Sequence, residues 1–251
     1  MAYVALGDVN TWYDVHGDGE PLVLLHPGGY DSRAWDASRD TLGARLRMFT
    51  PDRRGHGRTP DVDGPISYEL MARDTIAFME QVVGGPAHVL AMSDGVPVAL
   101  LVALHRPDLV RRLLLVAGVF HHEGWMPGAI DLDEESAALL GGLYGEVSPD
   151  GPDHYPVVAA KLDRMHRVEP TMTPADLKGV ASRTLVMVAD DDEVRLEHAV
   201  ALYRGVPAAE LAVVPGTSHG LLVEKPALCE EMILDFLAND PTPTLAPVTR
   251  S

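Results

Sequence analysis

Three kinds of polar side chain in this sequence have the chemistry that acyl transfer requires, and each follows a run of apolar residues. Ser93 follows the run HVLAM, the consecutive carboxylates Asp190, Asp191 and Asp192 follow TLVMVA, and His219 lies just beyond ELAVVPG. A histidine that a carboxylate orients can take the proton of a serine hydroxyl, and the oxygen then attacks a carbonyl carbon. A serine, an acid and a histidine, each after a different strand-like run, therefore predict nucleophilic catalysis.

The segment around Ser93 predicts a turn that would expose its hydroxyl. In HVLAMSDGVPVALLVALHR an apolar run stops at Ser93, Gly95 follows, and a helical pattern begins at once. A serine in such a turn lies at the carboxyl end of a sheet, beside the positive end of a helix dipole. Gly95 supplies one of the small neighbours that a strained turn needs. The alternative is a serine that only caps the helix, and the joint pattern with an acid and a histidine favours catalysis.

A second turn, in PLVLLHPGGYDSRAW, offers backbone amides. The apolar run ends at His26, and Pro27, Gly28 and Gly29 precede a helical segment. Glycine lets the backbone approach a ligand, and amides outside secondary structure can point at an anion. The alternative is a tight strand-to-helix turn without a ligand. The glycine spacing differs from GxGxxG, so the turn does not predict dinucleotide binding.

The elements expected to hold these turns alternate along the chain. Six short apolar runs have the character of buried parallel strands: PLVLLHP, MFTPD, HVLAM, RLLLVAG, TLVMVAD and ELAVVPG. Helical patterns accompany them: SRAWDASRDTL, SYELMARDTIAFMEQV, GVPVALLVALHR, RLEHAVALYRG and PALCEEMILDFL. This alternation predicts an α/β fold with a mostly parallel, doubly wound sheet.

One long stretch interrupts the alternation. Residues 122–182 contain helical patterns, glycines and prolines but no convincing strand, and a structureless loop of this length is uncommon in a compact domain. We expect an inserted helical cap there, with a core made of residues 1–121 and 183–238. The alternating prolines of NDPTPTLAPVTRS fit neither helix nor sheet, so a flexible tail is expected over residues 239–251.

The composition limits the partners and the compartment. The 251 residues include 20 basic and 37 acidic side chains, a net charge of −17, which would repel a nucleic acid and leaves a small-molecule substrate as the expected partner. No apolar run approaches the ~20 residues of a membrane span, and the start lacks a basic segment followed by an apolar core. The single Cys229 excludes an intrachain disulfide, so we expect a cytoplasmic protein with no membrane contact. The oligomeric state is not predicted.

Five ordered motifs resemble those of the α/β-hydrolase superfamily over roughly residues 3–238. HPGG resembles its HG oxyanion turn, PDRRGHGRT its PDxRGxGxS stretch, and AMSDG its GxSxG nucleophile elbow. ADDDEV resembles the GxxD turn that bears the acid, and GTSHGLLVEKP resembles the GxxHxxxxExP around the histidine. The resemblance implies the α/β-hydrolase fold with an inserted helical cap. Two departures are Ala91, in place of the first elbow glycine, and Pro27, in place of the glycine after His26.

The resemblance assigns roles to the catalytic candidates. It implies Ser93 as the nucleophile, His219 as the base and Asp192 as the acid that orients His219. Asp192 is favoured because Ala189 occupies the place of the glycine in GxxD, which puts the acid three positions later. Asp190 and Asp191 stay open as alternatives.

The resemblance also implies an oxyanion hole formed by the backbone N–H groups of Gly28 and Asp94. Because Pro27 has no N–H, the donor in this turn must come later, at Gly28 or alternatively at Gly29. The Arg53, Arg54 and His56 side chains fall in a turn that serves as loop scaffolding in such proteins. We therefore leave these three outside the catalytic set.

We expect Gly29, Met92, Asp94 and Trp125 to contact the substrate. The SDG sequence resembles α/β-hydrolases that cleave amino-acid esters, and a carboxylate beside the nucleophile would favour neutral or cationic acyl groups. The alternative is that Asp94 only complements the helix dipole. Further cap residues could line the pocket or belong to the core: Met126, Tyr144, Tyr155, Met165 and His166.

The expected function is that of a cofactor-free serine hydrolase acting on a small carboxylic ester or related carbonyl compound through an acyl-enzyme. His121, His122 and Glu123 do not predict a metal, because adjacent residues rarely face one ion and no HExxH or paired-cysteine spacing occurs. Two alternatives stay open. One is hydrolysis of a carbon–carbon bond in a β-diketone by the same triad, and the other is a binding protein of the same fold without turnover.

Overall fold

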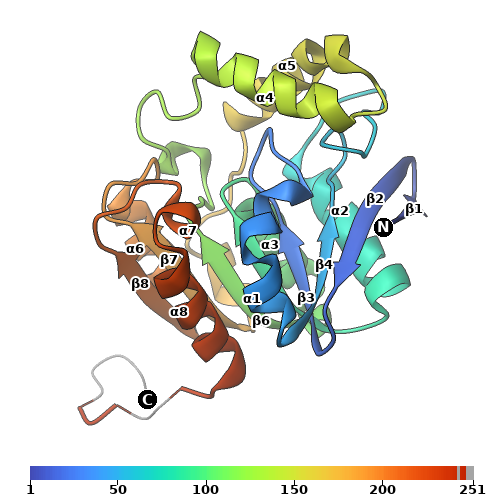
Figure 1. Ribbon diagram of the computed structural model, residues 1–251. Helices are drawn as coiled ribbons and strands as arrows, with labels where there is room; N and C mark the ends of the chain where they lie inside the picture. Colours follow the sequence, from blue (N-terminus) through green and yellow to red (C-terminus); the bar gives the residue numbers. More distant parts are fainter. Residues whose placement is uncertain (242–243, 247–251) are drawn as a thin grey trace.

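Eight strands form one sheet in the computed structural model, which describes residues 1–241 and 244–246 (Figure 1). Their order across the sheet is β1-β2-β4-β3-β5-β6-β7-β8. The bounds are β1 Ala2–Leu6, β2 Val9–His16, β3 Glu20–Leu25, β4 Leu46–Pro51, β5 Ala87–Met92, β6 Val110–Val116, β7 Arg183–Ala189 and β8 Ala209–Val214. All six apolar runs form strands, and these six are mutually parallel. The predicted α/β fold with a mostly parallel sheet is confirmed.

The parallel strands end together at one edge of the sheet. Met92 at the end of β5 pairs with Val116 of β6, which pairs in turn with Met187 of β7. Ala189 at the end of β7 pairs with Val214 of β8. The loops that leave these ends carry the expected catalytic serine, acid and histidine, so the topology gathers them at the edge where such folds bind ligands.

Helices cover both faces of the sheet (Figure 1). The α-helices are α1 Arg39–Gly43, α2 Tyr68–Phe78, α3 Gly95–His105, α4 Glu134–Val147, α5 Tyr155–His166, α6 Leu196–Gly205, α7 Leu221–Glu224 and α8 Pro226–Ala238. The 3-10 helices are η1 Ser32–Ser38, η3 Pro107–Leu109, η4 His122–Gly124, η5 Pro152–His154 and η6 Asp176–Gly179, and η2 Met79–Val83 is a π-helix. Helices α1 and α8 share one apolar cluster with the sheet, and α2 and α3 share the other.

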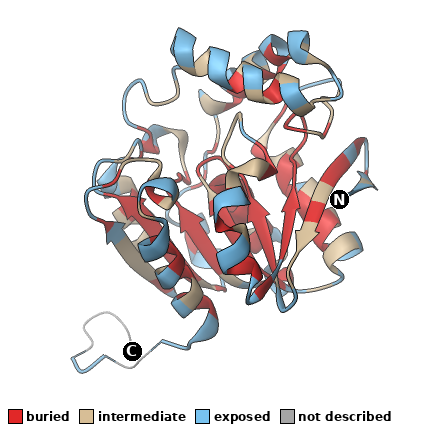
Figure 2. Ribbon diagram, in the orientation of Figure 1, coloured by how far each residue is buried: buried red, intermediate tan, exposed pale blue. Residues whose placement is uncertain are grey.

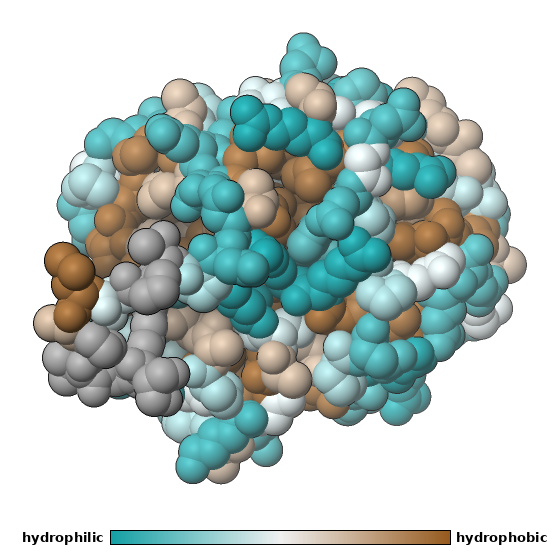
Figure 3. All heavy atoms as spheres, turned by 90° about the horizontal axis from the view of Figure 1, so that it is seen from below, coloured by the Kyte–Doolittle hydropathy of each residue, from teal (hydrophilic) through white to brown (hydrophobic). Residues whose placement is uncertain are grey.

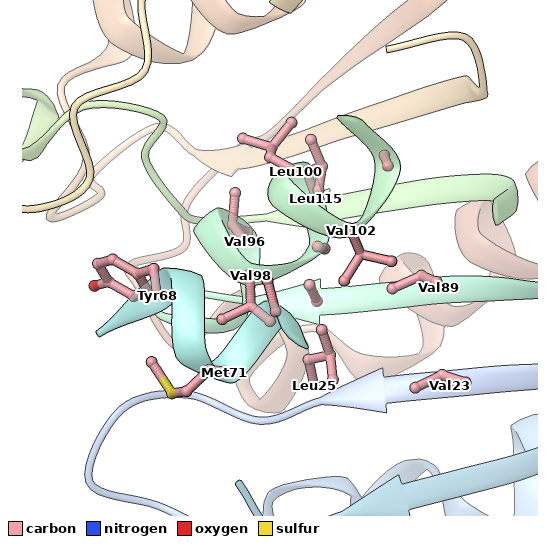
Figure 4. Close-up of a cluster of buried hydrophobic side chains, with 14 of the residues drawn as sticks. Val23, Leu25, Tyr68, Met71, Val89, Val96, Val98, Leu100, Val102 and Leu115 are labelled. Carbon is pink, nitrogen blue, oxygen red and sulfur yellow. The ribbon is translucent and has the colours of Figure 1, made fainter. Parts of the chain in front are cut away.

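Helix α3 is the best anchored of these helices. Its residues are apolar from Gly95 to Leu104, and Val98 and Leu100, which point to different sides of the helix, are both fully buried (Figure 4). Burying such a side chain contributes roughly 1.5–3 kcal/mol. Because α3 begins two residues after Ser93, the core fixes the position of this serine.

The structure adds two strands that the sequence did not predict. β1 and β2 form an antiparallel pair at the edge of the sheet, joined by a turn in which Gly7 has a φ of 63°. β1 is mostly exposed, and β2 contains the polar residues Asn10, Thr11, Asp14 and His16, so neither strand forms the apolar run of a fully buried strand. The helix expected at SRAWDASRDTL is instead η1 followed by the short α1, because the Asp31 carboxylate accepts from the Arg33 N–H (2.9 Å) and tightens the turn.

In the inserted segment, residues 122–182, helices α4 and α5 lie over the carboxyl edge of the sheet (Figure 1), whereas η6 packs against α3 and α6. All of the segment's residues are described, and none belongs to a strand of the sheet. Helices α4 and α5 turn one side toward the core, where Val158, Leu162 and Met165 of α5 join the apolar cluster, and leave the other side exposed (Figure 2). The position fits the cap that the sequence predicts, although the division into core and cap stays a prediction.

The remaining surface and the C-terminal segment complete the description. The face seen from below in Figure 3 mixes hydrophilic and hydrophobic residues. Among the helices of the described residues, none is long and apolar enough to cross a membrane. α8 ends at Ala238, where the tail was expected to begin, and the Asn239 carbonyl accepts from Arg112 and Arg183. The rest of the predicted tail lies partly outside the described residues, which exclude 242–243 and 247–251.

Replacing Gly95 should destabilise the fold, because a Cβ there would collide with the backbone carbonyl of Leu25. We expect Gly95→Ala to lower the free energy of unfolding by about 1–3 kcal/mol. Gly142→Ala is the matched control: it lies in α4 with open space around it, and we expect a gain of about 0.5–1 kcal/mol from helix propensity. Urea denaturation checks both. Equal stability of Gly95→Ala and the unaltered protein would contradict this account of the turn.

Candidate active site

The turn at Ser93 is strained, and its neighbours hold it in place. Ser93 follows β5 with a backbone φ of 53°, in the left-handed region that residues other than glycine rarely adopt. Its N–H donates to the Val116 carbonyl (2.9 Å), and its carbonyl accepts from the Val96 N–H (2.9 Å). Such a conformation costs on the order of 1–3 kcal/mol and is typical of functional sites. Ala91, which replaces the family glycine, is fully buried in β5 and is compatible with the turn.

Ser93, His219 and Asp192 form one hydrogen-bonded chain. Ser93 Oγ lies 3.0 Å from His219 Nε2, and His219 Nδ1 lies 2.8 Å from Asp192 Oδ1. With its proton on Nδ1, the ring donates to the carboxylate and accepts from the serine hydroxyl. The Asp192 oxygens also accept from the N–H groups of Ala189 (3.0 Å) and Val194 (3.1 Å). These amides fix the carboxylate, so the direction of the imidazole is fixed as well.

The three consecutive aspartates lie in different places. Asp192 alone among them contacts His219. Asp190 Oδ1 accepts from the Thr217 N–H (3.1 Å), and Asp191 donates its backbone N–H to the Thr217 carbonyl (3.2 Å). Asp190 and Asp191 thus join the loop after β7 to the loop after β8. The geometry puts Asp192 in the place that the motif comparison favoured.

The electrostatics of the pair favour a charged histidine beside a charged carboxylate. Burial lowers the pKa of His219, but the hydrogen bond and charge of Asp192 outweigh it and raise the pKa above the ordinary value. Burial raises the pKa of Asp192, while the hydrogen bond and charge of His219 and two backbone amides lower it overall. An imidazolium formed during proton transfer is therefore stabilised at this position.

The two expected oxyanion donors lie side by side near Ser93. Gly28 and Asp94 both line the same cavity as Ser93, and no hydrogen bond between described residues uses either of their backbone N–H groups. A Cβ on Gly28 would collide with the Asp94 carboxylate, so this position requires glycine. Gly29 has a φ of 70° and contacts Leu140 of α4. Two amides without partners next to a nucleophile can bind a developing oxyanion.

The Asp94 side chain is not free to bind a substrate cation by itself. Its Oδ1 accepts from the Tyr68 hydroxyl (2.7 Å), and its Oδ2 lies 2.8 Å from His166 Nε2. Burial alone would raise the pKa of Asp94, but the charge and hydrogen bond of His166, with Arg53 and Tyr68, hold it well below the ordinary range. The sequence expectation that this carboxylate faces the substrate is thus modified, because both of its oxygens have partners within the protein.

The Arg53 guanidinium holds the turn after β3 and the Ser93 turn together. Arg53 donates to the carbonyl of His26 (2.6 Å) and to that of Asp94 (3.1 Å), and its N–H donates to His26 Nε2 (3.0 Å). The ring of His56 lies 5.1 Å from that of His26. Burial, with the charge of Arg53, lowers the pKa of His56 to about 4, so this ring is neutral. Arg53, Arg54 and His56, which the sequence analysis left outside the catalytic set, do not line the cavity.

A cavity of about 660 Å³ lies between the sheet edge and the inserted segment. Of the expected substrate contacts, Gly29, Asp94 and Trp125 line it, whereas Met92 does not and packs against the apolar cluster that α1 and α8 share with the sheet. The further cap candidates divide: Tyr155 and His166 line the cavity, and Met126, Tyr144 and Met165 do not. The remaining wall is mostly apolar and includes Pro27, Tyr30, Ala129, Ile130, Leu132, Ala137, Leu139, Leu140, Ala159 and Leu162.

Trp125 lies against the catalytic candidate His219. The two ring centroids are 6.0 Å apart in an edge-to-face arrangement of 67°. The tryptophan is held by its neighbours, since Arg195 Nε donates to the Trp125 carbonyl (3.2 Å) and Met126 donates its N–H to the Glu193 carbonyl (2.7 Å). The loop from the inserted segment therefore shields one side of His219 with an apolar ring.

Several charged residues of the cavity wall escaped the sequence analysis. Arg167 pairs with Asp163 (2.7 Å) and Asp131 (3.2 Å), and Glu193 Oε2 lies 3.8 Å from His219 Nε2. Adjacency to Asp192 was the one signal that pointed to Glu193, and no motif marked the others. Within the described part of the chain, no group of three His, Cys, Asp or Glu side chains is arranged to hold a metal ion.

Comparison with known proteins places the chain in a family. A sequence model of the Alpha/beta hydrolase family matches residues 22–231, and the chain belongs to this family. It is 24% identical to "Putative carbamate hydrolase RutD" of Azorhizobium caulinodans, over 94% of this chain and 98% of that protein.

Solved structures of the same fold are also similar. An enol-lactonase from Burkholderia xenovorans has a TM-score of 0.76 at 20% identity and covers 94% of this chain and 100% of its own. A meta-cleavage product hydrolase from Pseudomonas fluorescens has a TM-score of 0.75 at 18% identity, covering 94% and 97%. At this level of identity the likeness shows the α/β-hydrolase fold, and it does not select among the reactions named.

The pairing of His219 with Asp192 can be measured directly. A raised pKa keeps the ring protonated in the folded state, so the stability that the pair adds is present below pH ~6.5 and is lost as the pH rises through the folded-state pKa. We expect Asp192→Asn to lower the His219 pKa and Asp191→Asn, the matched control, to leave it in place. Two-dimensional NMR titration of the histidine ring protons reports both values. A His219 pKa that does not move in Asp192→Asn would contradict the pairing.

Proposed function

We propose that this α/β-hydrolase is a cofactor-free serine hydrolase that cleaves small carboxylic esters through an acyl-enzyme. The observation that carries the proposal is the chain from Ser93 Oγ through His219 to Asp192, at a cavity that two unpaired amides also reach. The proposal assigns the nucleophile, the base, the orienting acid and the oxyanion donors that acyl transfer needs to residues around this cavity.

The proposed reaction has two halves. Ser93 Oγ attacks the ester carbonyl carbon while His219 Nε2 takes the hydroxyl proton, and Asp192 stabilises the imidazolium. The tetrahedral intermediate then breaks the carbon–oxygen bond to the leaving group, which receives the proton from His219 and departs as an alcohol. In the second half, water loses a proton to His219 and attacks the acyl carbon, and the bond to Ser93 breaks. The proton returns to Ser93, and the carboxylic acid leaves.

The oxyanion of each tetrahedral intermediate would be held by the N–H groups of Gly28 and Asp94. Each such donor is typically worth about 3 kcal/mol in transition-state stabilisation. Pro27 cannot contribute an N–H, and Gly28 is the next amide in the chain. The apolar wall around the cavity supports an uncharged acyl group and strengthens these interactions by excluding water.

The charges of the cavity wall support neutral or cationic substrates. His166 is paired with Asp94, Arg167 with Asp163 and His219 with Asp192, so the basic side chains of the described wall already have carboxylate partners. Glu193, whose side chain is 51% exposed, adds a negative charge beside His219. A substrate carboxylate would therefore meet repulsion, in a chain whose net charge is −17.

A fluorophosphonate probe tests the nucleophile. We expect one adduct on Ser93, located by peptide mass mapping, and no adduct on Ser93→Ala. Labelling of His219→Ala and Asp192→Asn should slow by at least about 100-fold, since the hydroxyl loses its base or the base loses its orientation. Asp191→Asn, which removes a neighbouring carboxylate outside the chain, should label at the normal rate. Well-folded protein that gives no adduct would favour the binding-protein alternative.

A pair of esters of similar size tests the charge preference. We expect kcat/KM for p-nitrophenyl butyrate to exceed that for mono-p-nitrophenyl succinate by at least about tenfold, because the second carries a carboxylate. Glu193→Gln should reduce the ratio of the two kcat/KM values. Glu231→Gln makes the same charge change on α8, outside the cavity wall, and should leave this ratio unchanged. Equal rates for the two esters would contradict the assigned substrate class. Turnover of a β-diketone that surpasses both esters would favour the carbon–carbon hydrolase.

A further inference from the structure

His166 connects the inserted segment to the turn that carries Ser93. It is the last residue of α5, and its Nε2 lies 2.8 Å from Asp94 Oδ2. The side chains are 17% and 4% exposed, so the contact is largely shielded from water. Asp94 directly follows Ser93 in the chain. A side chain of α5 thus reaches the residue whose amide is a proposed oxyanion donor.

The surroundings favour an ion pair at this contact. Burial lowers the pKa of His166, but the charge and hydrogen bond of Asp94 outweigh it, and the pKa is raised overall. Asp163 on the same helix acts in the same direction, and Arg53 from the loop after β4 opposes it. Two other groups face the pair, the neutral His56 ring and the Tyr68 hydroxyl of α2, which donates to Asp94.

An unpaired Asp94 carboxylate would oppose the proposed reaction. A Cβ built on Gly28 would overlap Asp94 Oδ2, so the charge is close to Gly28, and Asp94 itself supplies the other proposed oxyanion donor. Negative charge develops on the substrate oxygen at this place in the transition state, and a like charge at short range in a dry site raises the barrier. Tyr68 donates a hydrogen bond without carrying charge, and Arg53 contacts the carbonyl of Asp94 in place of its carboxylate. His166 is the positively charged group in direct contact with the carboxylate, whereas the Arg53 charge acts on it without such a contact.

We propose that His166 is a positioning residue of the proposed serine hydrolase, acting through Asp94: it neutralises the carboxylate beside the oxyanion donors and fixes α5 over Ser93. This inference rests on the proposed function. It separates the two roles of the SDG turn, since the Asp94 amide faces the substrate oxygen while its carboxylate binds the inserted segment. Loss of the imidazolium would leave a buried negative charge at the oxyanion site.

A double-mutant cycle measures this coupling. We expect His166→Gln to lower kcat for p-nitrophenyl butyrate by about 10- to 100-fold with less than about a threefold change in KM, because an uncompensated carboxylate acts on the transition state. In the Asp94→Asn background the same His166→Gln change should cost less than about threefold, since no charge is left to neutralise. If His166→Gln acted only by removing packing contacts, it would lower kcat by the same factor in both backgrounds.

His154→Gln is the matched control. His154 of η5 also connects the inserted segment to a core aspartate, Asp61, at 2.9 Å, but it does not line the cavity. We expect its kcat to stay within about twofold of the unaltered protein. If circular dichroism shows that His166→Gln does not fold, the pH dependence of kcat tests the inference instead. The unaltered protein should lose kcat at alkaline pH as His166 deprotonates, and Asp94→Asn should lack this loss.

The outcomes separate the inference from the proposed function. Unaltered protein with neither turnover nor a Ser93 adduct would overturn the proposed function, and this inference with it. Normal turnover with His166→Gln within twofold would overturn the inference alone. The inference would also be overturned if His166→Gln lowered kcat equally in the two backgrounds. The same holds if kcat fell at alkaline pH in Asp94→Asn as it does in the unaltered protein. A loss of kcat in His166→Gln that is much smaller in the Asp94→Asn background supports the inference.

Discussion

The left-handed backbone of Ser93 is the constraint on which the site depends. A φ of 53° is unfavourable for serine, and it persists because β6 accepts its N–H while the first turn of α3 donates to its carbonyl. Most residues of helix α3 are fully buried, so the helix has little room to shift and relieve the strain. The large apolar core therefore does more than stabilise the fold, because it holds one hydroxyl at the edge of the sheet within reach of His219.

Two histidine–aspartate contacts place opposite charges around that hydroxyl. His219 with Asp192 lies on the side of the proposed proton transfer, and His166 with Asp94 lies beside the proposed oxyanion donors. Each carboxylate has further hydrogen bonds that fix it: backbone amides hold Asp192, and the Tyr68 hydroxyl holds Asp94. In a site of low dielectric, a buried carboxylate that is paired with a histidine costs less free energy than an unpaired one. The pairing also reduces its repulsion of the negative charge that would form on the substrate in the proposed reaction.

Local signals in the sequence were sufficient for the six parallel strands of the sheet and for the catalytic candidates. The strand–turn–helix pattern located Ser93, and the motif spacing selected Asp192 from three adjacent aspartates. The strands β1 and β2 were missed because their residues do not form an apolar run. Contacts between distant segments were also missed, since no periodicity relates His166 to Asp94 across 72 positions. The position of α5 over the sheet sets that contact, and it depends on packing that a linear pattern does not encode.

The most direct test of the account is to trap the covalent intermediate from a true substrate. Acid quenching within the first turnover of p-nitrophenyl acetate, followed by mass spectrometry of the peptides, reports where the acyl group resides. The account predicts a single acetyl group on the peptide that contains Ser93, and its disappearance as turnover proceeds. Release of p-nitrophenol without any acetylated Ser93, or with the acetyl group on another residue, would contradict it.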